Sequence, residues 1–77
     1  MMKTFLEEVK NNDTARGIVK VAFERLTFAR TEKEYGYAEG LAGSVALIDG
    51  SPFDTTSEAI SFLWWLYENR DMAKRLY

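Results

Sequence analysis

The sequence contains no cysteine, no histidine and only one proline. Without cysteine, the chain has no disulfide framework, no thiolate metal site and no cysteine nucleophile. Without histidine, it lacks the commonest general base and the commonest ligand of transition metals. These two absences remove most enzyme chemistry. We therefore expect a protein that is not an enzyme, with no catalytic residues, no cofactor and no metal.

Long apolar runs are missing as well. The longest candidates span residues 41–48 and 62–67, whereas a membrane-spanning helix needs about 20 apolar residues. Glu7 and Glu8 follow the start of the chain too closely to leave room for the apolar stretch of a signal peptide. We therefore expect a cytoplasmic protein that does not bind membranes.

The composition is that of an ordinary globular chain. Hydrophobic residues make up 47% of the 77 residues and charged residues 29%, and the net charge is −2. This hydrophobic fraction is too high for a disordered chain, and the charge is too close to neutral for a strongly basic nucleic-acid binder. We expect one helical domain over residues 1–77, with nucleic acid an unlikely partner.

Two polar segments, at residues 11–13 and 49–54, read as turns because they are rich in Asn, Asp, Gly and Pro. Elsewhere apolar residues recur three and four positions apart, which is typical of amphipathic helices. The pattern predicts an all-α fold, a small bundle of three to four helices. Their approximate ranges are 2–10, 14–34, 36–48 and 56–76.

The predicted helix ends depend on local signals. Asp13 is the expected N-cap of the second helix, and Thr55 with Glu58 has the spacing of a capping box. A single helix from residue 14 to residue 48 would be roughly 50 Å long, so we expect a break near Gly36. For residues 44–48 a strand remains the alternative, because the segment ends in an Asp-Gly turn signal.

Three glycines share one face of the third predicted helix, namely Gly36, Gly40 and Gly43. Each glycine costs a helix about 1 kcal/mol relative to alanine, so three of them call for a packing reason. We expect this face to pack closely against another helix. A hinge or bend is the alternative.

Two helices carry a second apolar strip in addition to the face that would form the core. The first strip consists of Val21, Phe28 and Tyr35, and the second of Trp65, Met72 and Leu76. A chain of this size has one small core and buries only about 60–65% of its unfolded surface. We therefore expect these six residues to form a partner or self-association interface, with Trp65 and Phe28 as anchors. The alternative is that the tryptophan rings cover the edges of an irregular core.

These features favour a small protein-binding module that acts as a regulator, adaptor or inhibitor and that forms a homodimer or binds another protein. In size, in its lack of Cys and His and in its aromatic-rich helical composition, the chain is similar in general character to small accessory proteins of phages and mobile elements. Some of these inhibit a host protein by binding it. The alternative is a DNA-associated regulator of transcription or replication that uses the basic bias of helix 14–34.

Overall fold

The computed structural model describes residues 2–76 of the chain. Within this range it contains five α-helices, two 3₁₀ turns and no strand. The elements are α1 (Met2–Lys10), α2 (Asp13–Phe28), α3 (Glu32–Ser44), η1 (Val45–Leu47), α4 (Thr56–Glu68), α5 (Arg70–Ala73) and η2 (Lys74–Leu76). The all-α prediction is confirmed, and the strand considered for residues 44–48 is wrong because α3 continues there into a 3₁₀ turn.

The helices predicted at 14–34 and 36–48 correspond to α2 and α3, but the break lies at residues 29–31 and not near Gly36. The count of five α-helices exceeds the predicted three to four, because the last predicted helix is divided into α4 and α5. Thr31 ends the connection and caps α3: its hydroxyl accepts from the backbone N–H of Glu34 at 3.2 Å, and the Glu34 carboxylate accepts from the backbone N–H of Thr31 at 3.2 Å. The backbone N–H of Arg30 also donates to this carboxylate, which holds the pKa of Glu34 below its ordinary value. These reciprocal hydrogen bonds of the capping box favour the start of a new helix at Glu32 over continuation of α2.

The other helix ends follow local hydrogen bonding too. The N-cap of α2 is Asn12 and not Asp13, since the Asn12 side chain accepts from the backbone N–H of Ala15 at 3.1 Å. The capping box of Thr55 and Glu58 is confirmed. The helix predicted at 56–76 is interrupted at Asn69, whose backbone leaves the helical region and whose side-chain amide donates to the carbonyl of Trp65.

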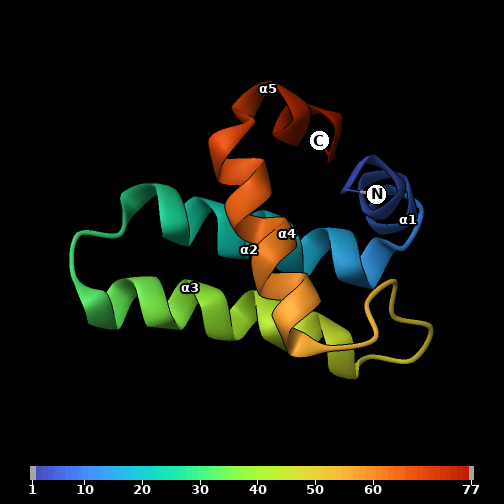
Figure 1. Ribbon diagram of the computed structural model, residues 1–77, viewed down its shortest axis with the longest axis horizontal. Coiled ribbons are helices and arrows are strands. Elements are labelled where there is room, and N and C mark those ends of the chain that lie inside the picture. Colours follow the sequence, from blue (N-terminus) through green and yellow to red (C-terminus); the bar gives the residue numbers. More distant parts are fainter. Residues whose placement is uncertain (1, 77) are drawn as a thin grey trace.

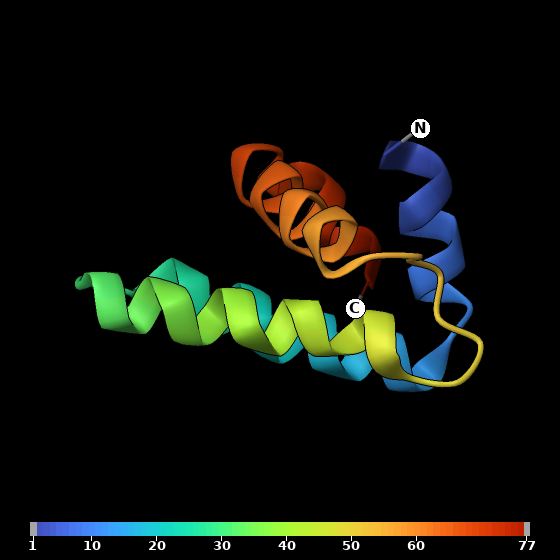
Figure 2. The same cartoon turned by 60° about the horizontal axis from the view of Figure 1, so that its bottom comes forward.

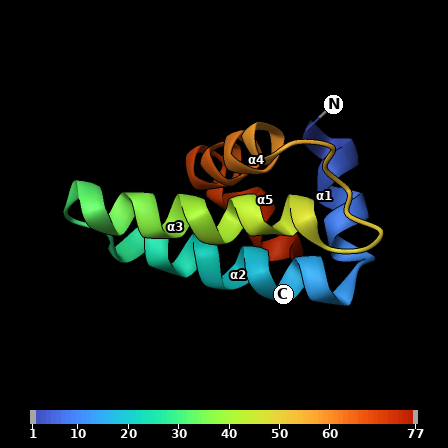
Figure 3. The same cartoon turned by 90° about the horizontal axis from the view of Figure 1, so that it is seen from below.

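The helices form two layers. Figure 1 shows α2 and α3 running side by side in opposite directions, with α4 crossing over them. After a rotation of 60°, α4 lies above this pair while α1 stands at one end (Figure 2). Seen from below, α4 lies above the α2–α3 pair, α1 stands at one end of it and α5 lies behind α3 (Figure 3). The lower face of the α2–α3 pair is therefore not covered by any other helix of the described chain.

Two groups of buried side chains hold the layers together. Phe62 of α4 is fully buried, and its ring centroid lies 5.5 Å from that of Phe53 and 6.3 Å from that of Phe5. This first group joins α4 to α1, to the first half of α2, to η1, to the loop before α4 and to the C-terminal turns. The second group joins α4 to α2 and α3. It consists of Ala22, Leu26, Ala38, Ala42 and Leu63.

The alanines of the second group explain why α2 and α3 lie so close together. Ala38 and Ala42 of α3 are buried, as is Ala22 of α2, so small side chains face each other along the pair.

No helix described between residues 2 and 76 is both long and apolar enough to cross a membrane.

Candidate protein-binding surface

The second predicted strip, on the C-terminal helices, belongs largely to the core. Leu76 is 3% exposed, and Trp65 and Met72 are half-buried and pack against the same buried group. Trp65 stacks on Phe62 with ring centroids 5.8 Å apart. The expectation for Leu76 is wrong, because the helix breaks at Asn69 and the final turn folds back against α1, which covers this side chain. An interface role for Trp65 and Met72 stays a prediction.

The first predicted strip is divided between two surfaces. Val21 and Phe28 of α2 are 46% and 76% exposed, whereas Tyr35 is half-buried and stacks on Trp64 of α4 with centroids 5.9 Å apart. The seven-residue spacing places these side chains on one face only if the helix is continuous. The break between α2 and α3 changes the register, and Tyr35 turns toward α4. An interface role for Tyr35 stays a prediction.

Tyr37 takes the place expected for Tyr35 on the outer surface, where it is 55% exposed. Sequence reasoning missed this residue because it treated residues 14–34 as one helix. The available signal was the Thr-x-x-Glu spacing of Thr31 and Glu34, which has the same form as the one recognised at residues 55–58. The helix that starts at Glu32 places Tyr37 on the outer side of the α2–α3 pair, in the same groove as Phe28.

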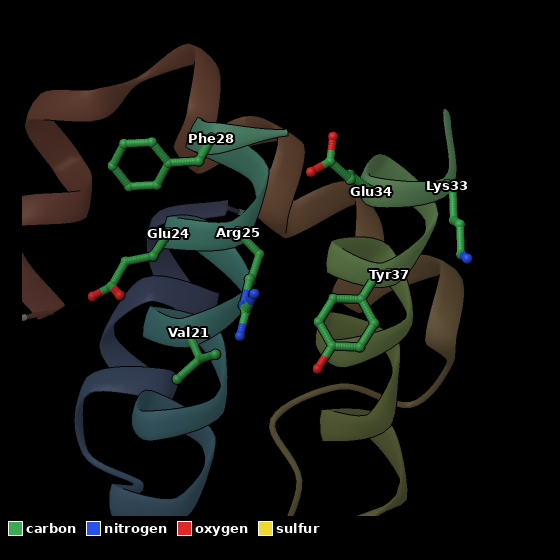
Figure 4. Close-up of a pocket in the computed structure, with 7 residues that line it drawn as sticks. All are labelled: Val21, Glu24, Arg25, Phe28, Lys33, Glu34 and Tyr37. Atoms are coloured by element: carbon green, nitrogen blue, oxygen red, sulfur yellow. The ribbon is translucent and has the colours of Figure 1, made fainter. Parts of the chain in front are cut away.

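The outer side of the α2–α3 pair carries a groove with a volume of about 550 Å³. It is lined by Val21, Glu24, Arg25, Phe28, Lys33, Glu34 and Tyr37. Figure 4 shows Arg25 and Tyr37 between the two helices, and the Arg25 guanidinium carbon lies 5.4 Å from the centre of the Tyr37 ring. This distance is within the range of a cation–π contact. We call these seven residues the docking face.

The two outer edges of the docking face differ in charge. Glu24 points away from α3 at the free edge of α2, and Lys33 lies at the free edge of α3 (Figure 4). Between them lie one further base, Arg25, and one further acid, Glu34. The face thus presents two acids and two bases around the exposed rings of Phe28 and Tyr37.

Trp64 of α4 contacts α3 and does not line the docking face. Its indole N–H donates to a carboxylate oxygen of Glu39 at 2.7 Å. Its ring also lies edge-on to that of Tyr67, with centroids 5.8 Å apart. Trp64 therefore links α4 to α3 within the chain.

The expected close packing of three glycines is wrong for two of them. A Cβ atom built on Gly36 or Gly40 would have no neighbour within 4 Å, and both residues are exposed. Gly43 is buried against α4, but a Cβ there would lie 3.6 Å from the Cβ of Thr56, which is an ordinary contact. The structure therefore gives no packing reason for glycine at positions 36 and 40.

We expect Gly40→Ala to raise the free energy of unfolding by about 1 kcal/mol, because alanine restricts the unfolded chain and meets open space in the folded one. Gly50→Ala is the matched control. Gly50 has a φ of +70°, so alanine there would strain the backbone and should lower the free energy of unfolding by about 1 kcal/mol. Urea denaturation of both variants checks the opposite signs, and a loss of stability in Gly40→Ala would contradict the exposed position of this residue.

Comparison with protein families, with curated proteins and with solved structures finds no match to this chain. Among residues 2–76, no group of three or more acidic, cysteine or histidine side chains is arranged to hold a metal ion.

Proposed function

We propose that this chain is a small, non-enzymatic protein-binding module, acting as a regulator, adaptor or inhibitor, and that it engages its partner through the docking face. The observation that carries the proposal is the exposure of Phe28, which is 76% accessible beside the exposed Val21 and Tyr37. Fully burying a phenylalanine side chain contributes about 1.5–3 kcal/mol, which folding of this chain leaves unused. A partner that covers the ring would gain this contribution.

The composition of the docking face supports the proposal. Aromatic residues and arginine are enriched at protein interfaces, and a few of them usually dominate the binding energy. Here Phe28, Tyr37 and Arg25 occupy the same groove, and Arg25 is already positioned over the Tyr37 ring. The arginine therefore loses less freedom on binding than an unrestrained side chain would.

Nucleic acid is less well supported as a partner. The basic residues of the expected helix 14–34 are divided between α2, the connection and α3. Arg16 forms an ion pair with Asp13 at 3.0 Å, and Arg25 contacts Tyr37. Phosphate binding needs an excess of positive charge, whereas the docking face carries acids and bases in equal number.

Photo-cross-linking in the native host tests the proposal. A photoreactive phenylalanine analogue is placed at position 28, and for comparison at position 7, which is exposed on α1. We expect a defined protein cross-link from position 28 that is absent from position 7 and that Val21→Glu abolishes. Equal cross-linking from both positions, a cross-link to nucleic acid or no cross-link at all would contradict the proposal.

A further inference from the structure

We infer that the partner covering the docking face is a second copy of this chain, related by a two-fold axis that runs parallel to α2 and α3. The inference rests on the proposed function and names its partner. It is carried by the distribution of charge over the face, where two acids and two bases surround Phe28 and Tyr37.

A face with equal numbers of acids and bases is suited to binding itself. In a two-fold dimer the same patch is used on both subunits, so each acid must find a base within the same set of residues. A patch of one sign would repel its own copy and would need a foreign partner of opposite charge. The docking face carries acids and bases in equal number, so it is suited to its own copy and does not require a foreign partner of opposite charge.

The position of the charges selects the direction of the axis. Glu24 lies at the free edge of α2 and Lys33 at the free edge of α3, on opposite sides of the groove (Figure 4). An axis parallel to the helices places α2 of one copy over α3 of the other, so that Glu24 of each copy meets Lys33 of its partner. An axis across the helices would place each edge against the same edge, bringing Glu24 toward Glu24 and Lys33 toward Lys33.

A two-fold dimer needs a larger contact than the groove alone. A standard interface buries about 800 Å² on each partner, roughly a sixth of the 4911 Å² surface of this chain. The molecule measures 31 × 26 × 20 Å, and the α2–α3 pair spans its longest dimension (Figure 1). The outer surface of both helices on either side of the groove would therefore have to join the contact.

Sedimentation velocity of the purified chain, at two salt concentrations, provides the test. We expect a dimer that Glu24→Lys or Lys33→Glu alone weakens about ten-fold, since each substitution converts both attractive pairs into repulsive ones. An equimolar mixture of the two variants should recover wild-type affinity, because one variant then carries two lysines opposite two glutamates. The rescue should diminish at high salt.

Charge changes of the same kind on α1 provide the controls. Glu7→Lys and Lys3→Glu alter the net charge equally, but they lie outside the docking face and should leave the dimer unchanged. A wild-type chain that is monomeric up to roughly 0.1 mM overturns the inference. So does a dimer whose two weakened variants are not rescued by mixing.

The two proposals fail in different ways. If position 28 cross-links to a different protein and the pure chain is monomeric, the second-copy inference is overturned while the proposed function stands. If position 28 gives no specific cross-link, the proposed function is overturned as well.

Discussion

Phe62→Ala is expected to lower the free energy of unfolding by about 3–5 kcal/mol, the usual range for removing a fully buried phenylalanine. The Phe62 side chain is 0% exposed and contacts three other aromatic rings, those of Phe5, Phe53 and Trp65. The first two belong to α1 and to the loop before α4, so the resulting cavity cannot close without moving separate segments. A chain of this length has a total stability of about 4–12 kcal/mol, and a large part of it would be lost.

Phe28→Ala is the matched control for this experiment. It makes the same chemical change at a side chain that is 76% exposed, and we expect it to lower the free energy of unfolding by less than about 0.5 kcal/mol. Both variants are compared with the wild-type protein by urea denaturation at submicromolar concentration, so that self-association does not contribute. Similar losses at positions 62 and 28 would contradict the assignment of one ring to the core and the other to the surface.

Leu63→Ala is expected to lower the free energy of unfolding by about 2–5 kcal/mol, because Leu63 is the α4 residue of the second buried group. It packs against small alanines of α2 and α3, which cannot extend into the space that the substitution leaves. Leu47→Ala is the control. Because Leu47 is 79% exposed, this substitution should lower the free energy of unfolding by less than about 0.5 kcal/mol.

Hydrogen exchange distinguishes the second group from the first. In Leu63→Ala we expect faster amide exchange in the α2–α3 pair than in α1, since the lost contacts are those that hold α4 on this pair. Unchanged exchange in α2 and α3, together with a small loss of stability, would show that the second group does not hold the layers together.

Hydrophobic periodicity was sufficient to predict the helical class, and the same spacing describes the buried face of α2. Ala15, Val19, Ala22 and Leu26 follow the three-and-four spacing in α2, and all four are buried. The capping box at residues 55–58 was read correctly because the interaction is local. Such features depend on residues only a few positions apart, so the sequence contains what is needed to predict them.

The candidate surface was harder to predict because it depends on register across a break. Val21 and Phe28 lie within α2 and are exposed, whereas Tyr35 lies beyond the break and turns toward α4. Leu76 was misplaced for the same reason, since the interruption at Asn69 changes the direction of the chain. A helical projection predicts which residues share a face only within one continuous helix.

The separation of the docking face from the buried groups has an evolutionary consequence. The docking face lies on the outer side of the α2–α3 pair, whereas the second buried group packs this pair against α4. Apart from Glu34, whose carboxylate caps α3, the residues of the docking face can therefore be substituted with little effect on folding. The proposed binding surface can thus change in sequence while the helical framework is retained.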